Sequence, residues 1–361
     1  MSLILILYIV LVTIASVYWL LISQKNGTSK NVSFTIIVPV RNEEKHLENL
    51  LNSIKNLDYQ HYELIVINDL STDGTQNILE SFQKKWTFKI INLERTNSSP
   101  KKMAIQRAIQ EASGDYILCT DGDCILPAKI LQKYAYQFLD NGKLFLSGPV
   151  TFFEPQTSFL KSIWTKFQIV EFASLTGVGA VAMHLQKPNM CSGANISFNK
   201  DVFFELNGYE GNLQLASGDD EFLMHKFANA YPGKVAYVKD QDCIVETASA
   251  DNLNTFLEQR KRWASKWRSY ESLLPSLLAF FIFTVNIISI FLEWYLSFKW
   301  LMLRYVLEAF FIGNVLWFLK KQNSLWYIIP VQILYKYYVV FTAFSVLLGK
   351  KTYIWKGRNL K

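Results

Sequence analysis

The sequence predicts an α/β fold built on an open, mostly parallel sheet, with apolar helices before and after it. Two observations support this prediction. Between residues 34 and 119, short runs rich in β-branched residues alternate with segments whose apolar residues recur at helical spacing. Long apolar segments precede and follow this region. Such alternation is typical of a Rossmann-like sheet, whose ligands bind at the carboxyl ends of the strands.

The first element is the apolar segment Leu3–Ile22, which has no charged residue and is about as long as a bilayer-spanning helix requires. A cleaved signal peptide is the alternative. It is disfavoured because no basic region precedes the segment and no small-residue cleavage site follows it. We therefore expect residues 1–24 to form an N-terminal transmembrane anchor.

Four short apolar runs then fit buried parallel strands, and amphipathic helices are expected between them. In the segment from Glu43 to Leu57, the apolar residues form one helical stripe. The first strand is followed by PVRNEE and not by GxGxxG, so a dinucleotide-binding enzyme is poorly supported. The strands are expected at Phe34–Val38, Glu63–Asn68, Phe88–Ile91 and Asp115–Cys119.

Beyond Val150 the alternation stops. The segment Phe159–His184 mixes aromatic residues with Lys161, Lys166 and Glu171. Its amphipathic character suits a helix at the membrane interface, and an ordinary helix that packs on the soluble core is the alternative.

The C-terminal region, residues 271–349, is expected to form further transmembrane helices. Charges inside such segments usually face protein or a watery cavity. Arg304 and Glu308 fall four residues apart in the second segment, and Lys336 falls in the third. The Arg304–Glu308 pair could simply pack helices or could line an acceptor site, and the sequence leaves both open. The segments are Leu273–Leu292, Trp300–Leu319 and Leu325–Leu348.

The basic residues give conflicting information about orientation in the membrane. Lys25, Lys30 and the segment Arg260–Arg268 favour a central domain in the cytoplasm. Three further crossings would put the C-terminus outside, whereas the basic tail, residues 350–361, favours the cytoplasm. Either one segment is re-entrant or interfacial, or the tail is an exception. We expect a multi-pass protein of the cell membrane with a cytoplasmic catalytic domain at residues 31–270.

Charge and composition limit the classes of binding partner that are expected for this protein. The formal net charge of +7 is concentrated near the membrane ends, which suits anionic lipid head groups. No segment resembles a nucleic-acid-binding module, so no nucleic-acid partner is expected. The cysteines have neither CxxC nor metal-site spacing, and reduced thiols are expected at Cys119, Cys124, Cys191 and Cys243.

Four polar clusters follow one another along the chain, and each suits one task in sugar transfer. A nucleoside needs a hydrogen-bond acceptor, a diphosphate needs a cation held by carboxylates, an attacking hydroxyl needs a general base, and a departing diphosphate needs positive charge. Taken singly, each cluster has a structural explanation, such as a helix cap, a solvated turn or a basic surface helix. The clusters are Asp69 in NDLSTDGT, Asp121 and Asp123 in TDGDC, Asp219 and Asp220 in SGDDEF, and Gln259–Trp263 with the sequence QRKRW.

In the order and the residues of these clusters, the segment from Phe34 to Trp263 resembles the membrane-bound family-2 glycosyltransferases. This family includes ceramide glucosyltransferase and the processive polysaccharide synthases. The resemblance implies a GT-A fold and a metal-dependent, inverting hexosyltransferase that uses a UDP-sugar. By position, Asp220 would be the catalytic base and Asp123 the ligand of Mg²⁺ or Mn²⁺. The substrate-binding residues implied in the same way are Arg41, Glu43, Asp69, Lys101, Asp121, Asn195, Asp219, Gln259, Arg260, Arg262 and Trp263.

One departure concerns the nucleoside. Many members of this family carry an acid where Asn68 stands, so only Asp69 is left for the nucleoside role. The acceptor is expected to be a membrane lipid at the cytoplasmic leaflet, because about three C-terminal segments are few for a polymer channel. A processive polysaccharide synthase that extends a glycan is the alternative, and a catalytically silent nucleotide-binding scaffold is a third possibility.

Overall fold

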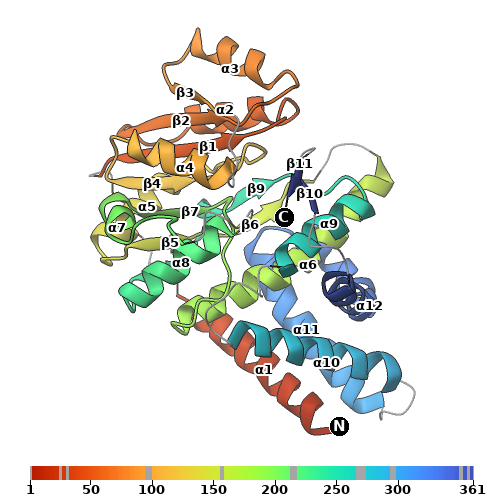
Figure 1. Ribbon diagram of the computed structural model, residues 1–361. Coiled ribbons are helices and arrows are strands. Elements are labelled where there is room, and N and C mark those ends of the chain that lie inside the picture. Colours follow the sequence, from red (N-terminus) through yellow and green to blue (C-terminus); the bar gives the residue numbers. More distant parts are fainter. Residues whose placement is uncertain are drawn as a thin grey trace. The chain divides into compact units, whose positions relative to one another are not determined.

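A computed structural model describes residues 2–23, 27–29, 32–93, 100–154, 158–211, 218–265, 274–292, 298–348, 353–355 and 358–360. The chain divides into two units. The helical unit comprises Met1–Ile22, Glu154–Val181 and Ser249–Lys361. The sheet unit comprises Ser23–Phe153 and Ala182–Ala248. Figure 1 colours the elements by their place in the chain.

The sheet unit is organised around a seven-stranded sheet with the order β3-β2-β1-β4-β7-β5-β8. Strand β1 pairs in parallel with β2 and β4, and β2 pairs in parallel with β3, whereas β7 runs antiparallel to both of its neighbours. The predicted mostly parallel sheet is therefore confirmed, and the four predicted strands, β1 to β4, lie within a few residues of their expected bounds. The strands are β1 Phe34–Val40, β2 Tyr62–Asn68, β3 Lys89–Asn92, β4 Tyr116–Cys119, β5 Phe145–Ser147, β7 Ile196–Asn199 and β8 Val235–Tyr237.

Helices and one small parallel pair complete this unit. Helix α2, Leu47–Lys55, buries Leu47, Leu50, Leu51 and Ile54, which recur at helical spacing as the sequence predicts. A separate pair joins β6, Val150–Phe152, to β9, Val245–Thr247. The other helices are α3 Thr75–Gln83, α4 Pro100–Gln110, α5 Ile130–Leu139, α7 Lys200–Glu205, α8 Asp219–Ala230 and the 3₁₀ turn η1 Gln241–Cys243.

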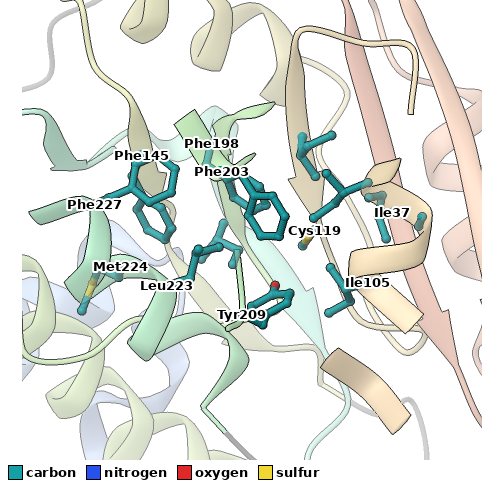
Figure 2. Packing of buried hydrophobic residues seen from close by; sticks show 14 of the residues in the cluster. Ile37, Ile105, Cys119, Phe145, Phe198, Phe203, Tyr209, Leu223, Met224 and Phe227 are labelled. Carbon is teal, nitrogen blue, oxygen red and sulfur yellow. The ribbon is translucent and has the colours of Figure 1, made fainter. Parts of the chain in front are cut away.

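Aromatic packing in the core fixes the position of helix α8. Figure 2 shows Phe227 of this helix gathered with Phe145 and Phe198 of the sheet. The ring centroids of Phe145 and Phe227 lie 5.4 Å apart, and Leu223 is almost fully buried in the same cluster. The residues that anchor α8 follow Asp219 and Asp220 by one turn or more. The apolar core therefore sets where the acidic N-terminus of this helix lies.

The helical unit contains the apolar helices. In the part of the chain that the structure describes, three stretches are long and apolar enough to cross a membrane: Leu3–Leu21, Lys299–Phe318 and Gln322–Leu348. The apolar stretch Ser276–Phe291 is shorter. The helices are α1 Ser2–Leu21, α6 Phe159–His184, α9 Leu253–Ser265, α10 Leu274–Leu292, α11 Phe298–Phe318, the 3₁₀ turn η3 Gln322–Tyr327 and α12 Ile328–Leu348, and a short hairpin pairs β10 Tyr353–Trp355 with β11 Arg358–Leu360.

This division differs from the predicted boundaries, because most of α6 and the whole of α9 group with the apolar helices and not with the sheet. One cause is close packing at Gly177 of α6, where an added Cβ would lie 2.7 Å from the ring of Phe311 in α11. At the start of α6, Phe159 and Leu160 are strongly exposed. The interfacial position of α6 stays a prediction.

Arg304 and Glu308 join four helices of this unit. The Arg304 Nε atom donates to Glu308 Oε1 over 2.8 Å, and the Tyr8 hydroxyl donates to the same oxygen over 2.6 Å. Gln332 Nε2 donates to Glu308 Oε2 over 3.1 Å, and Arg304 Nη1 donates to the hydroxyl of Ser289. Of the two alternatives left open by the sequence, these contacts favour helix packing.

Some predictions fall outside the described residues. They concern Lys25, Lys30, Leu273, the continuation of the basic segment at residues 266–268, and the lysines of the C-terminal tail. All four cysteines lie within the described ranges, and none is in a disulfide.

Candidate active site

The ends of three neighbouring parallel strands supply the first group of polar residues. Strand β1 lies between β2 and β4, so Arg41, Asp69 and Asp121 follow adjacent strands at one edge of the sheet. The backbone N–H of Asp69 donates to the carbonyl oxygen of Val40 over 2.9 Å, which joins the ends of β1 and β2. The residues that the sequence placed at this edge are therefore brought together.

Arg41 holds the turn after β2. Its Nη1 atom donates to the carbonyl oxygens of Asp69 and Leu70 over 2.6 and 2.9 Å. Leu70 has a φ of 53°, a left-handed conformation that is uncommon outside glycine. The guanidinium of Arg41 therefore stabilises the turn that carries Asp69. The side chain of Asp69 is buried.

The start of α3 is held by Asp73. Its carboxylate accepts from the Thr75 hydroxyl over 2.6 Å and from the backbone N–H groups of Thr75 and Glu44 over 3.1 and 3.2 Å. Burial opposes ionisation, but these hydrogen bonds outweigh it and lower the pKa of Asp73. Asp73 therefore stabilises the start of α3, whereas Asp69, the other acid of NDLSTDGT, directly follows β2.

Glu43 links this edge to the TDGDC turn. Its side chain is buried, and its backbone N–H donates to the Thr75 hydroxyl over 2.8 Å. A Cβ added at Gly122 would lie 2.8 Å from Glu43 Cγ and 3.0 Å from Val40 Cγ1. Gly122 therefore allows the turn between Asp121 and Asp123 to pack directly against Glu43, a requirement that sequence reasoning missed.

Lys101 lies among the acids of the site. Its Nζ atom is 2.9 Å from Asp121 Oδ1 and 3.2 Å from Asp219 Oδ2. Burial alone would lower the pKa of Lys101, but Asp121, Asp219 and then Asp220 outweigh it and raise the pKa. The lysine is therefore a stable cation that joins helix α4, the turn after β4 and helix α8.

Asp220 is held by two backbone N–H groups. Its Oδ2 atom accepts from Gly193 and its Oδ1 atom accepts from Glu221, each over 2.8 Å. A Cβ at Gly193 would lie 3.4 Å from Asp220 Oδ2 and 3.6 Å from Lys101 Nζ. A longer side chain at position 193 would therefore enter the space between the carboxylate and the ammonium group. The small residues of CSGAN mark this approach in the sequence.

Asn195 is hydrogen-bonded within the protein. Its side chain is fully buried, its Oδ1 atom accepts from the Tyr134 hydroxyl over 2.6 Å, and its Nδ2 atom donates to the carbonyl oxygens of Pro149 and Cys243 over 3.0 and 2.9 Å. Every polar atom of this amide thus has a protein partner. Asn195 therefore braces the core, and its contact with substrate stays a prediction.

A divalent ion would need ligands from outside the protein. Among the described residues, no group of three or more His, Cys, Asp and Glu side chains could hold a metal ion. Asp121 is paired with Lys101, and Asp123 lies half-buried on the same turn. Mg²⁺ and Mn²⁺ prefer oxygen ligands and are commonly bound by one or two carboxylates together with phosphate oxygens and water. The donor set therefore fits an ion whose coordination is completed by a diphosphate.

The QRKRW segment lies on α9 in the helical unit. Arg260 is buried, and its guanidinium is engaged by the carboxylate of Glu171 through Nε at 2.9 Å and Nη2 at 2.5 Å. The guanidinium of Arg260 thus has a protein partner, and its contact with substrate stays a prediction. Gln259, Arg262 and Trp263 are half-buried on the same helix.

Part of the chain is similar to a known protein family. Residues 35–205 match the Glycosyl transferase family 2 profile. The chain contains a family-2 glycosyltransferase domain. This domain includes Arg41, Asp69, Lys101, Asp121 and Asp123, whereas Asp220 and α9 follow it.

Two curated relatives of the family-2 domain come from staphylococci. Poly-beta-1,6-N-acetyl-D-glucosamine synthase of Staphylococcus epidermidis is 29% identical over 195 residues, which are 54% of this chain and 45% of that protein. Poly(ribitol-phosphate) beta-N-acetylglucosaminyltransferase TarS of Staphylococcus aureus is 34% identical over 111 residues, which are 30% of this chain and 19% of that protein. The matches span less than half the length of these relatives.

One solved structure shares the fold of the whole chain. Mannosyltransferase PcManGT from Pyrobaculum calidifontis, in complex with GDP-Man and Mn²⁺, matches with a TM-score of 0.53 and 17% identity over 95% of this chain and 94% of that chain. Together with the mostly parallel sheet, this likeness confirms the predicted GT-A type of fold.

Proposed function

We propose that this chain is a membrane-anchored, inverting glycosyltransferase that transfers a sugar from a UDP-sugar to an acceptor hydroxyl. The observation that carries the proposal is the convergence of Lys101, Asp121 and Asp219, with Asp220 one residue further on α8. Two separate segments of the family-2 domain, α4 and the turn after β4, and helix α8 after the domain supply these groups. Such a site suits a charged donor and an acid–base step.

Asp220 is the residue proposed to remove the proton from the acceptor hydroxyl. The hydroxyl oxygen then attacks the anomeric carbon from the face opposite the diphosphate, and the bond from that carbon to the diphosphate breaks. The backbone N–H groups of Gly193 and Glu221 fix the direction of both carboxylate oxygens of Asp220. A general base that is held in this way is ready for proton transfer without rearrangement.

The donor is proposed to meet the sheet unit at the carboxyl ends of β1, β2 and β4. Asp69 would accept a hydrogen bond from the nucleoside, and Lys101 would approach the negative charge of the diphosphate. A Mg²⁺ or Mn²⁺ ion held by Asp123 would supply further positive charge to the leaving group. N-acetylglucosamine appears in the names of both curated relatives, so a UDP-linked N-acetylhexosamine is the first donor to test.

The acceptor is proposed to be a glycan, with a membrane lipid as the second candidate. The names of the relatives, which specify a polysaccharide and a poly(ribitol-phosphate), favour the glycan. The small number of apolar stretches in the described part of the chain favours the lipid, because a processive synthase needs enough helices to form a channel. In either case the catalytic domain is proposed to lie on the cytoplasmic side.

The decisive experiment measures UDP release by the purified full-length protein from a panel of UDP-sugars. Reactions would contain either total lipid extract or short glycan primers. Release that requires a primer and gives products of increasing size supports the glycan proposal. Release that requires lipid and gives one discrete product supports single transfer to a lipid. No release under any condition, with UDP still bound, would leave a nucleotide-binding scaffold.

A further inference from the structure

We infer that Glu171 is a positioning residue for the proposed transfer. Its ion pair with Arg260 orients Gln259 and Trp263 of α9, which would contact the acceptor. The inference rests on the proposed function. Glu171 lies on α6 and Arg260 on α9, with both side chains buried in the helical unit. Two parallel hydrogen bonds connect them, from Nε to Oε1 at 2.9 Å and from Nη2 to Oε2 at 2.5 Å. A bidentate pair fixes both distance and direction.

Arg260 in turn contacts Gln259 and Trp263, two residues that the family resemblance implies as substrate-binding and that this inference places at the acceptor. Its Nη1 atom donates to Gln259 Oε1 over 2.5 Å. Its guanidinium carbon lies 4.2 Å from the ring centroid of Trp263 and 4.4 Å from that of Phe256. The guanidinium therefore lies over two aromatic rings while its edge is held by a carboxylate. Movement of Arg260 would move the side chains of Gln259 and Trp263 with it.

Glu171 also connects α9 to α12. The Tyr338 hydroxyl donates to Glu171 Oε1 over 3.3 Å, and the ring centroids of Tyr338 and Phe256 are 5.5 Å apart. Helix α12 belongs to a stretch that is long and apolar enough to cross a membrane. One carboxylate thus ties the motif helix to α6 and to a candidate membrane helix.

Stability alone does not explain such a pair. The cost of desolvating two charges often exceeds their attraction, so apolar residues of similar volume can replace a buried ion pair without loss of stability. An apolar pair, however, cannot direct Gln259 and Trp263. This difference separates a positioning role from a merely structural one.

The test compares Glu171→Gln with Glu154→Gln in the full-length, membrane-reconstituted protein. Glu154, which precedes α6, makes a longer and more exposed contact with Lys166 of α6, at 3.9 Å. It is therefore a matched control for the loss of one carboxylate charge. Glu171→Gln is expected to raise the acceptor KM by roughly 10- to 100-fold, because small displacements of positioning groups have effects of this size. The donor KM should stay within about twofold of the wild type. Glu171→Asp should restore part of the acceptor affinity.

A double variant and one activity-independent measurement complete the test. Glu171→Met with Arg260→Leu should recover the wild-type melting temperature but keep the raised acceptor KM. Amide hydrogen exchange of residues 253–265 should be faster in Glu171→Gln than in Glu154→Gln. Unchanged exchange would overturn the inference whether or not the enzyme is active. An unchanged acceptor KM in active Glu171→Gln would also overturn the inference, as would a wild-type acceptor KM in the double variant. An inactive wild-type protein, with altered exchange in Glu171→Gln, would count against the proposed function alone.

Discussion

The two units of this molecule handle charge in different ways. In the sheet unit, Lys101 contacts Asp121 and Asp219, and Asp220 adds to the same field, so acids outnumber the cation. In the helical unit, Arg260 is paired with Glu171 and Arg304 with Glu308, one cation to one anion. A site with excess negative charge can accept a cation, whereas a balanced buried pair is already complete.

Solvent exposure follows the same division. The side chains of Lys101 and Asp121 are 22% and 38% exposed, whereas those of Arg260 and Glu171 are 2% and 6% exposed. Water and ligands can compete for the first pair but not for the second. Substitutions of Lys101 or Asp121 in the sheet unit should therefore cost little stability, whereas removal of one partner from a buried pair in the helical unit should cost stability.

The largest expected effect is on the rate of transfer in Asp220→Asn. Asn can accept only one of the two hydrogen bonds from Gly193 and Glu221, because its Nδ2 group is a donor, and it cannot take a proton. Turnover should fall by roughly 10²–10⁴-fold, while the affinity for UDP-sugar should stay nearly unchanged. Steady-state kinetics and donor binding should be measured on the same variant. A parallel loss of donor affinity would place Asp220 in the nucleotide site, and normal turnover would remove it as the base.

The next prediction concerns stability in the helical unit. Glu308→Gln should destabilise the protein by ~3–5 kcal/mol, because it leaves the buried guanidinium of Arg304 without its anionic partner. Thermal unfolding in detergent is the measurement. The control is Glu111→Gln in the sheet unit, which has two exposed partners, Lys89 and, at the same four-residue spacing and 3.2 Å away, Arg107. That control should cost no more than ~1 kcal/mol. Equal losses in the two variants would contradict the contrast between the units.

Binding of the donor should respond to Asp123→Ala. The variant should fold normally, because a surface turn loses little stability on truncation. Its affinity for UDP in the presence of Mn²⁺ should fall by at least ~10-fold, since even the loss of supporting groups around a metal has this effect. Titration calorimetry with UDP, with and without Mn²⁺, measures the change. Affinity equal to that of the wild type would remove Asp123 from the metal site.

The smallest expected effect is that of Tyr8→Phe, which removes one hydrogen bond to Glu308 but keeps the ion pair. Hydrogen bonds between membrane helices contribute ~0.6 kcal/mol on average. Thermal unfolding of this variant should therefore lie much closer to the wild type than to Glu308→Gln. A loss as large as that of Glu308→Gln would show that the hydrogen bond from α1, and not the charge balance, holds the cluster.

The sequence by itself determined strands β1 to β4, the apolar helices and the positions of Asp69 and Asp121 relative to the strand ends. Side-chain alternation and helical spacing report local structure, and parallel strands end at one edge of a sheet. Asp69 and Asp121 could therefore be assigned to one site from their places directly after β2 and β4.

Only the tertiary structure decided which polar residues face the interior. Asn195 bonds to Tyr134 in the core, and Arg260 is bound by Glu171, which lies 89 positions earlier in the chain. Gly193 and Gly122 matter because of atoms that a Cβ would meet from distant segments. Local periodicity contains no information on such partners, because burial and pairing of a polar group depend on which segments the fold brings together.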